Sequence, residues 1–336
     1  MVPQDLTVPA VFVIGPTASG KTALAHALAD TLPFLKLLNL DALQFYRGVT
    51  AGTAKPTAEE IENYGYALVD FLPASARFDA QEYAGLAREA CERALAAGNL
   101  PLCVGGSGLY LRALLHGLDN LPPADADFRA RLRAEVASGR ADAEGRTGWP
   151  AAHARLGLVD AVRASEVHPN DGTRIERALE IYALTGKPMS AARERLEVLK
   201  EQPSLFVPFV VRVEPDRDTL KKRIAARTRS LVGRAWKDEV EELHAAYGAK
   251  LRTFQSFQAI GYTQMLDVVQ ERRPWDVAAL TAEIETLTWQ YARRQLTWNR
   301  KETAHAIVET VTPREIQTLA EQISLFRESV RKKELT

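Results

Sequence analysis

Eight consecutive residues near the start of the chain could hold a diphosphate. They fit the pattern G-x-x-x-x-G-K-[ST] without a mismatch. In such a loop, glycines let backbone N–H groups converge on an anion, and the following helix adds the positive end of its dipole. Lys21 supplies a mobile charge, and the Thr22 hydroxyl is a ligand for a Mg²⁺ that bridges the phosphates. The predicted diphosphate-binding residues are Gly15, Pro16, Thr17, Ala18, Ser19, Gly20, Lys21 and Thr22. The motif does not tell whether the diphosphate is hydrolysed, transferred or expelled.

Asp41 is the next candidate, because it directly follows the β-rich run 36–40. A carboxylate after the second strand of such a fold often caps a helix or serves the metal. Alternatively, an ionised carboxylate beside the transferred group acts as a general base when it lies within hydrogen-bond reach of a proton. Position alone leaves both roles open.

Two later segments are rich in basic residues. In residues 212–237, Arg and Lys outnumber Glu and Asp, and a helix with arginines that fold over bound phosphates is typical of a phosphoryl-transfer lid. We expect one or two of these arginines to reach the ligand. Residues 291–301 interleave basic and aromatic side chains, a composition that suits RNA. Without further information, an amphipathic helix with Leu296 and Trp298 in the core is the favoured interpretation.

The elements that must position these residues alternate between strands and helices. The expected strands are 11–14, 36–40, 67–71, 102–104, 209–213 and 305–308. The expected helices are 21–32, 80–97, 108–116 and a closing helix from 314. The alternation is typical of a parallel α/β sheet flanked by helices. Because ligands of such sheets bind beyond the carboxyl ends of the strands, we expect the phosphate loop, Asp41 and the turn at 105–108 on one edge.

The strand signal disappears from about residue 118 and returns at 206–213. We therefore expect three segments: a first part of the core at 1–117, an all-helical insertion at 118–202, and the resumed core at 203–336. Within the insertion, 172–185 reads as a helix with Gly186 as its C-cap. Its apolar stripe is expected to contain Ile175, Leu179 and Tyr182.

The composition is that of an ordinary globular protein. The chain has 336 residues, 46% hydrophobic and 26% charged, with a formal net charge of zero. This argues against disorder and gives no global charge for a polyanion, although it does not exclude a local basic face. Cys91 and Cys103 lack partners at metal-ligand spacing, so buried reduced thiols are expected. With no signal peptide, no run of ~18 apolar residues and no coiled-coil pattern, we expect a cytoplasmic monomer without a membrane anchor.

Six motifs occur in order over nearly the whole chain. Besides the phosphate loop they are Asp41-Ala42-Leu43-Gln44 with Gly52-Thr53-Ala54-Lys55-Pro56, Gly105-Gly106-Ser107-Gly108-Leu109-Tyr110, His168-Pro169-Asn170-Asp171, Gly261-Tyr262 and Arg293-Arg294-Gln295-Leu296-Thr297-Trp298. Together they resemble the bacterial tRNA dimethylallyltransferase family. Each motif is weak by itself, but six at compatible spacing are specific, and a plain nucleotide kinase would not carry the last three.

The resemblance implies a P-loop NTPase-like parallel sheet with an all-helical insertion, Mg²⁺ as cofactor, and tRNA and dimethylallyl diphosphate as substrates. The family transfers the dimethylallyl group to N6 of the adenosine at tRNA position 37, beside the anticodon, and releases pyrophosphate. The phosphate loop would then bind the leaving group rather than a nucleotide. By resemblance, Asp41 accepts the N6 proton, while Lys21, Arg227 and a Mg²⁺ on Thr22 stabilise the departing pyrophosphate.

The resemblance also implies which residues contact tRNA. They are Asp41, Ala42, Leu43, Gln44, Ser107, Arg129, Thr173, Arg174, Ile175, Glu176, Arg177, Gln258, Ala259, Ile260, Gly261, Tyr262 and Thr263. Arg129 and Arg174 would place the insertion against the anticodon stem-loop, where loop shape and phosphates are read.

Several positions depart from the usual family pattern. The departures are Ala42 for Ser, Ser107 for Thr, Ala235-Trp236 for a Gly-aromatic pair, Thr263 for a longer polar residue and Trp289 for Arg. None lies in the phosphate loop, at Asp41 or at Arg227, so we expect activity to be kept and fine tRNA preference to be affected.

Two other function classes are alternatives to the prenyltransferase. A P-loop kinase for a nucleotide or small metabolite would account for the phosphate loop, but it needs neither the helical insertion nor the run 293–298. A non-catalytic RNA-binding module would leave Lys21, Thr22 and Asp41 without a purpose. The ordered motif set favours the prenyltransferase.

Overall fold

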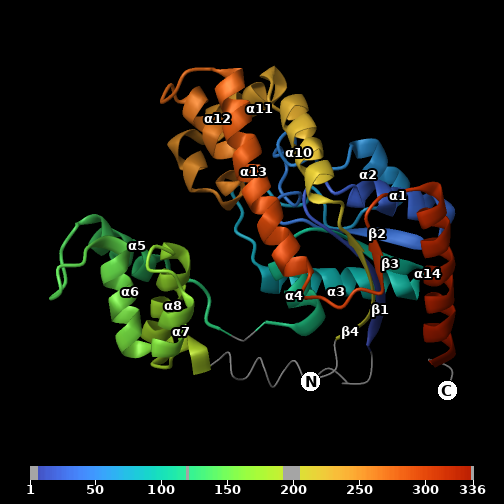
Figure 1. Ribbon diagram of the computed structural model, residues 1–336, viewed down its shortest axis with the longest axis horizontal. Coiled ribbons are helices and arrows are strands. Elements are labelled where there is room, and N and C mark those ends of the chain that lie inside the picture. Colours follow the sequence, from blue (N-terminus) through green and yellow to red (C-terminus); the bar gives the residue numbers. More distant parts are fainter. Residues whose placement is uncertain (1–6, 119–120, 192–204, 334–336) are drawn as a thin grey trace. The chain divides into compact units, whose positions relative to one another are not determined.

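The computed structural model describes residues 7–118, 121–191 and 205–333 (Figure 1). The chain divides into two compact units. Met1–Gly117 and Ser204–Thr336 form the first, called here the core unit, and Leu118–Pro203 forms the second, called here the insertion unit.

The core unit is built on a parallel sheet with the strand order β2-β3-β1-β4-β5 among the described residues. The strands are β1 (Val8–Ile14), β2 (Leu35–Leu40), β3 (Leu100–Gly105), β4 (Phe206–Val213) and β5 (Ala306–Val308). β1 is apolar and buried along its whole length, as a central strand covered on both faces must be. The predicted parallel α/β fold is confirmed.

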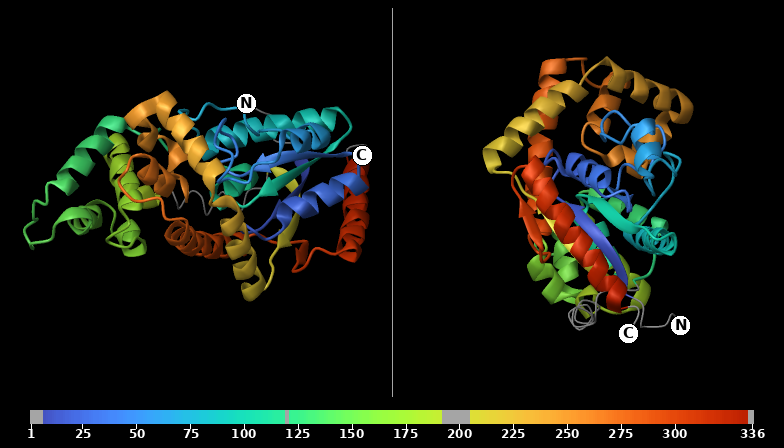
Figure 2. Two further views of the ribbon diagram at one scale, coloured as in Figure 1. Left: turned by 90° about the horizontal axis from the view of Figure 1, so that it is seen from above. Right: turned by 90° about the vertical axis from the view of Figure 1, so that its right-hand side faces the viewer.

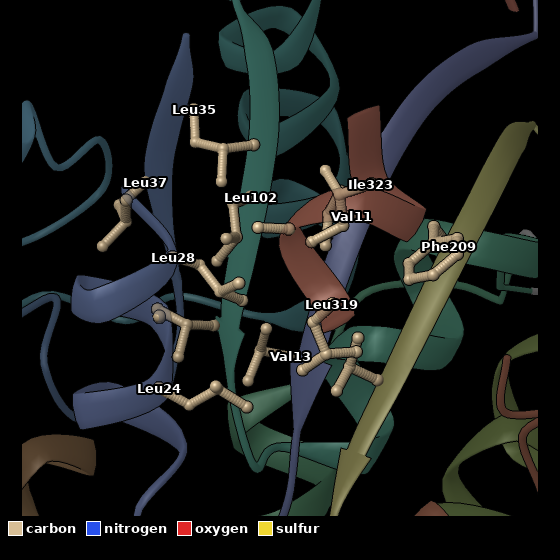
Figure 3. Close-up of a cluster of buried hydrophobic side chains, with 14 of the residues drawn as sticks. Val11, Val13, Leu24, Leu28, Leu35, Leu37, Leu102, Phe209, Leu319 and Ile323 are labelled. Carbon is tan, nitrogen blue, oxygen red and sulfur yellow. The ribbon is translucent and has the colours of Figure 1, made fainter. Parts of the chain in front are cut away.

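One face of the sheet is covered by α1 (Lys21–Thr31) and α14 (Pro313–Lys333). Because side chains alternate along a strand, every second residue of β1 points to this layer. Val11 packs here in one cluster with Leu28 of α1 and Ile323 of α14 (Figure 3). This layer fixes α1, and therefore the loop that precedes it, against the centre of the sheet.

The opposite face carries α3 (Ala80–Ala96), which contacts β1, β2 and β3, together with α4 (Gly108–His116), which packs on α3. The ring of Tyr83 stacks on Phe45 with centroids 5.5 Å apart. Its hydroxyl donates to the carbonyl of Asn39 at 3.0 Å. Aromatic packing on this face thus holds the carboxyl end of β2 in place.

The other helices of the core unit follow the sheet in sequence or connect its strands. They are α2 (Ala58–Tyr64), α10 (Arg217–Leu231), α11 (Arg234–Tyr247), α12 (Tyr262–Val269) and α13 (Val277–Asn299), with 3₁₀ segments at Gly248–Thr253 and Gln255–Gln258. α10 packs on α13 and α11 packs on α12, as the yellow and orange ribbons of Figures 1 and 2 show.

The insertion unit is helical over its described residues, as predicted, and is drawn in green in Figure 2. Its helices are α5 (Ala126–Ala137), α6 (Gly148–Val159), α7 (Ala161–Glu166) and α8 (Gly172–Thr185). The unit has its own core, in which Leu132, Leu156, Ile175 and Leu179 are buried. The expected α8 is confirmed, with Gly186 as a left-handed C-cap, although Tyr182 is exposed rather than part of the stripe.

The strand expected at 67–71 does not form. Ala67 makes an isolated bridge to Leu38, but Leu68 and Asp70 adopt positive φ angles of 59° and 56°. Two left-handed residues so close together turn the backbone and prevent a continuous ladder. The amide of Asn39 donates to the carbonyl of Leu68 at 3.0 Å and holds this turn on β2.

Two smaller expectations concern the cysteines and the membrane. Cys91 and Cys103 are free and buried, as predicted. A hydrogen bond with Cys91, followed by burial, raises the pKa of the Cys103 thiol. Within the three described stretches, no helix is long and apolar enough to cross a bilayer.

Candidate active site

The register of the sheet brings the predicted loops to one edge. Ile14 of β1 pairs with Gly105 of β3, and Gly105 pairs in turn with Leu40 of β2. The residues that follow these three, including Gly15 and Asp41, therefore leave the sheet side by side. Gly105 has no room for a side chain, since a Cβ would lie 2.1 Å from the carbonyl oxygen of Leu40.

The phosphate loop has the curled backbone that anion binding requires. Ala18 and Gly20 adopt positive φ angles of 62° and 97°, which turn successive N–H groups inward. Leu24 makes the first backbone bond of α1, to the carbonyl of Gly20 at 3.0 Å. The N–H groups of residues 21–23 thus precede the first intrahelical bond at the positive end of the helix dipole. Thr22 is exposed on this first turn.

Lys21, Arg227 and Asp41 are half-buried side chains whose charges act on one another. Burial lowers the pKa of Lys21 to about 8, while the charge of Asp41 raises it and that of Arg227 lowers it. Burial also lowers the pKa of Arg227, and Asp41 opposes this shift. The Nζ of Lys21 donates to the carbonyl of Pro16 at 3.2 Å. Two partly desolvated cations and one carboxylate leave unbalanced positive charge, which favours binding of an anion.

Asp41 is fixed by its neighbours rather than free in solvent. Its N–H donates to Oδ1 of Asn39 at 2.9 Å, and its own Oδ1 accepts from the N–H of Leu43 at 3.0 Å. The next residue, Ala42, donates its N–H to the hydroxyl of Ser107 at 3.1 Å. Ser107 is the N-cap of α4, so this bond ties the loop after β2 to the loop after β3.

Tyr291 of α13 lies in the same electrostatic environment and was not among the predicted site residues. Burial, followed by the negative charge of Asp41, raises the pKa of its phenol, while a side-chain hydrogen bond with Ser107 lowers it. The phenol is therefore protonated at neutral pH beside a carboxylate. It places a further hydroxyl next to the two residues expected to meet the substrate base.

Helix α10 holds the phosphate loop from one side. The guanidinium of Arg223 donates to the carbonyl of Ser19 at 2.8 Å. Ala18 packs against a small cluster that contains Leu220 and Ile224 of α10 and Ala292 of α13. Arg223 therefore contacts the phosphate loop itself, and the charge of Arg227 acts on Lys21 in that loop. Contact between these arginines and the ligand stays a prediction.

Helix α13 reaches the loop through a side-chain amide. Gln295 accepts the N–H of Thr17 at 2.8 Å and donates to the carbonyl of Gly106 at 2.9 Å. On the same helix, Arg293 and Arg294 are exposed and Leu296 is partly buried. The arginines are exposed, as the amphipathic interpretation of residues 291–301 expects, but Leu296 and Trp298 are only partly buried and do not form the core of this face. The buried positions are Ala292, Gln295 and Asn299, so the buried stripe is largely polar.

A second junction joins the loop after β2 to α11 and α12. A Cβ on Gly52 would lie 2.2 Å from the indole of Trp236, and one on Gly261, at a φ of 90°, would lie 2.0 Å from it. The carboxylate of Glu239 accepts the N–H of Ala51 at 2.9 Å and the hydroxyl of Tyr262 at 2.6 Å. Trp236, the aromatic member of the pair Ala235-Trp236, thus fills a notch made by two glycines of the family motifs.

The predicted tRNA residues of the insertion unit fall into two classes. Ile175 is fully buried in the core of the unit. Glu176 is also buried, and its carboxylate accepts from the guanidinium of Arg133 at 2.6 Å. Arg129 makes a two-pronged ion pair with the buried Glu180, both contacts at 2.8 Å.

These contacts show that some of the predicted tRNA-contacting residues stabilise the insertion unit itself. Burial acts to raise the pKa of Glu180, but bonds from Arg129 and Arg177 outweigh it and the pKa is lowered. Thr173 and Arg174 are exposed, and only the latter carries a solvent-facing charge at the start of α8. Side-chain contact with RNA is thereby restricted to the exposed members, because Ile175 and Glu176 are covered by their own unit.

The remaining predicted positions line the loops already described. Gln44 donates to the carbonyl of Ala54 at 3.1 Å, and Gln258 donates to that of Arg252 at 2.9 Å. Thr263 bonds to the carbonyl of Phe257 at 2.9 Å. The others are Leu43 and Ile260, which are half-buried, and Ala259, which is buried.

Sequence reasoning assigned no individual role to Arg223, Glu239, Tyr291 or Gln295. Two signals were available for Gln295. It lies in the run 293–298, and it occupies the stripe Ala292-Gln295-Asn299, whose spacing of three and four residues marks one helix face. A buried amide on such a face needs partners, but the sequence alone does not identify them.

The residues at the phosphate loop fit a Mg²⁺ carried by a diphosphate. Among the described residues, no group of three or more His, Cys, Asp or Glu side chains could hold a metal by itself. Mg²⁺ in phosphate sites is commonly bound by one or two protein oxygens, the phosphates and water. The exposed hydroxyl of Thr22, beside the N–H groups of the first turn, meets that requirement.

Comparisons with known proteins identify the family of this chain. The family model described as IPP transferase matches residues 44–302. A tRNA dimethylallyltransferase of Dechloromonas aromatica is 36% identical over 96% of this chain and 98% of its own length. One of Methylibium petroleiphilum is 41% identical over 85% of this chain and 84% of its own.

A solved structure of a relative supports the same family assignment. The crystal structure of the tRNA isopentenylpyrophosphate transferase of Bacillus halodurans has a TM-score of 0.66 and 31% identity, and it covers 98% of this chain and 100% of its own. These matches span the chain nearly end to end, so the regions they cover include the parallel sheet and the helical insertion. This chain belongs to the IPP transferase family, the family of the bacterial tRNA dimethylallyltransferases.

Proposed function

We propose that this protein transfers a dimethylallyl group from dimethylallyl diphosphate to N6 of the adenosine at tRNA position 37, next to the anticodon. Family membership supports prenyl transfer to tRNA. The observation that supports the mechanism is that Asp41 leaves the sheet at the same edge as the phosphate loop and that its charge acts on Lys21 and Arg227. A base and a cation pair that face one another suit a reaction in which a proton leaves on one side and a diphosphate on the other.

On the leaving side, the bond between C1 of the dimethylallyl group and the diphosphate oxygen breaks, and its electron pair goes to pyrophosphate. The growing negative charge is met by the N–H groups of the first turn of α1 and by Lys21 and Arg227. Preorganised donors of this kind typically contribute about 2.7–4 kcal/mol each to transition-state stabilisation. A Mg²⁺ on Thr22 would neutralise further charge on the diphosphate oxygens.

On the attacking side, the exocyclic amine of adenine forms the new N–C bond with C1. Its lone pair is delocalised into the ring, so the amine is a poor nucleophile, and positive charge builds on N6 as the bond forms. Asp41 accepts a proton from N6 as this charge builds. The backbone contacts of Asp41 with Asn39 and Leu43 hold its carboxylate in one orientation for this step.

The target adenosine must leave the stack of the anticodon loop to reach Asp41, at a cost of roughly a few kcal/mol. The loops at 41–44 and 107 and the segment 258–263 are proposed to receive the unstacked bases. Arg174 is proposed to contact phosphates of the stem-loop, because it is exposed at the start of α8. We propose that the enzyme works as a monomer in the cytoplasm, where its tRNA substrate is found.

A transfer assay tests the function. The protein is incubated with radiolabelled dimethylallyl diphosphate, Mg²⁺ and an anticodon stem-loop that carries adenosines at positions 36, 37 and 38. Label is expected in the RNA and absent when position 37 is guanosine. The kinase alternative predicts instead consumption of ATP with phosphate transfer to a small molecule, which is measured in parallel. RNA that stays unlabelled in the presence of all substrates would rule out the proposal.

A further inference from the structure

A single buried amide joins the two loops that form the candidate active site. Gln295 is only 4% exposed, and both ends of its side chain are bonded. Its Oε1 accepts the N–H of Thr17 in the phosphate loop at 2.8 Å, and its Nε2 donates to the carbonyl of Gly106 in the loop after β3 at 2.9 Å. The two loops belong to different strands and are bridged here by a third element, α13.

The bridge is closely fitted. A Cβ on Gly106 would lie 2.4 Å from Nε2 of Gln295 and 2.6 Å from the carbonyl oxygen of Gly15. A Cβ on Gly108 would lie 2.9 Å from the side chain of Trp298, one turn further along α13. The backbones of both loops therefore pass within van der Waals contact of each other and of the helix, and only glycine permits that approach.

The N–H groups of the phosphate loop have different partners. The N–H of Thr17 is directed to the amide of Gln295, and that of Ser19 to the carbonyl of Pro16 at 3.2 Å. The N–H groups of residues 21–23 precede the first intrahelical bond of α1 and can meet the diphosphate. Gln295 thus acts on the shape of the loop and not on the ligand.

Loop shape matters because the two halves of the reaction are bound by different loops. The phosphate loop holds the leaving group, while Ser107, one residue after Gly106, bonds the N–H of Ala42 beside Asp41. Any change in the distance between the two loops is a change in the distance between the breaking bond and the base. A misplacement of about 1 Å can cost roughly a hundredfold in rate.

We infer that Gln295 is a positioning residue for prenyl transfer: by bonding Thr17 and Gly106 together it sets the separation of the diphosphate half from the base half of the site. The inference rests on the proposed function. It requires that loss of the bridge lowers the rate of the chemical step, while each half keeps its own ligand.

Gln295→Met tests the bridge, because methionine has a similar length and no strong hydrogen-bonding group. We expect kcat to fall about a hundredfold. The dissociation constants for inorganic pyrophosphate and for the stem-loop RNA, each measured alone by calorimetry, should change less than threefold. kcat is expressed per pyrophosphate-binding site found in the same titration, so that unfolded protein does not count.

Gln295→Glu supplies a signature that mere packing would not produce. A protonated carboxyl can accept from Thr17 and donate to Gly106 as the amide does, whereas a carboxylate must face the Gly106 carbonyl without a proton. Burial raises the pKa of such a carboxyl. The kcat of the variant relative to wild type should therefore increase as the pH is lowered from 8 to 5.5, and the same ratio for Gln295→Met should stay flat.

Ile284→Val is the matched control, since Ile284 is buried on the same helix away from both loops. It should lower Tm and leave kcat and KM unchanged. Wild-type protein that transfers no label would defeat the proposed function itself. Active wild type with an undiminished kcat in both Gln295 variants would overturn the inference, as would a loss fully explained by fewer binding sites. A Met variant that does not fold leaves the pH ratio of the Glu variant to decide.

Discussion

Asp41 is the residue on which charge and geometry converge. Burial lowers the pKa of Lys21 and of Arg227, and the charge of Asp41 opposes both shifts. Burial raises the pKa of the Tyr291 phenol, and the charge of Asp41 adds to that shift. From its position in the sequence, Asp41 could equally have been a cap or a metal ligand. Its neighbours favour the proposed role of a base, because backbone contacts hold its carboxylate in one orientation at the same edge of the sheet as the phosphate loop.

Asp41→Asn tests this role, because it replaces one carboxylate oxygen by an amide nitrogen. The amide keeps the shape of the side chain and cannot accept the N6 proton, so we expect kcat to fall by about 10²–10⁴. Pyrophosphate binding should not weaken, since a negative charge near Lys21 is removed. Single-turnover transfer and calorimetry measure the two quantities. A variant that transfers as fast as wild type would remove the base assignment.

Lys21 makes pyrophosphate binding depend on pH. Its pKa of about 8 in the ligand-free protein means that it loses its charge between pH 7 and 9. The dissociation constant for pyrophosphate should rise about tenfold over this range relative to Lys21→Arg, whose side chain stays charged. Parallel profiles for the two proteins would contradict the shift.

The same shift affects stability in the opposite sense. Between about pH 8 and the ordinary lysine range, the unfolded chain binds more protons at Lys21 than the folded protein does. Stability of the ligand-free protein therefore rises with pH through that window.

At the scale of elements, glycines decide how closely the helices approach the active-site loops. Trp236 of α11 fills the notch between Gly52 and Gly261, and Glu239 of the same helix accepts from Ala51 and Tyr262. α11 thereby connects the loop after β2 with the start of α12. Both connected segments contain residues proposed to receive the RNA.

Gly261→Ala tests this junction. The methyl group would meet Trp236 at 2.0 Å, and the φ of 90° is unfavourable for alanine. We expect a loss of about 2–4 kcal/mol in the free energy of unfolding. Gly85→Ala is the control, because Gly85 lies within α3 with nothing within 4 Å of the added methyl, and it should gain about 0.5–1 kcal/mol. Denaturant unfolding measures both, and equal effects would disprove the notch.

Prediction of the elements succeeded where periodicity was clear and failed where long-range contacts decide. The run 67–71 looks like a strand because it is apolar, but the amide of Asn39 holds the carbonyl of Leu68 and the chain turns. Helix α8 was predicted with its bounds, since the apolar stripe and Gly186 are local signals.

At the scale of the whole molecule, the chain inserts a separate helical unit between α4 and β4. That unit has its own hydrophobic core and its own ion-pair network, in which Glu176 and Glu180 are buried against arginines. Its predicted RNA contacts are thereby reduced to the exposed side chains. Arg174 is the clearest of these.

Arg174→Ala should weaken binding of the anticodon stem-loop and reduce the slope of log affinity against log salt by about 0.7–0.9, the value for one phosphate contact. Arg140→Ala, which removes another exposed arginine of the same unit, is the control and should keep the wild-type slope. Fluorescence anisotropy over a salt series measures both. An unchanged slope for Arg174→Ala would exclude a phosphate contact.

The sequence by itself determined the phosphate loop, the parallel α/β class and the helical insertion, because each depends on contiguous residues or on local periodicity. Tertiary structure alone decided which distant residues meet. The register of β2, β3 and β1 places Asp41 and Gly15 at the same edge of the sheet, on either side of β3, and packing of α13 brings Gln295 to Thr17 across 278 positions of the chain. Burial also withdrew Ile175 and Glu176 from solvent. Such contacts depend on how separate elements pack, and no local pattern records that.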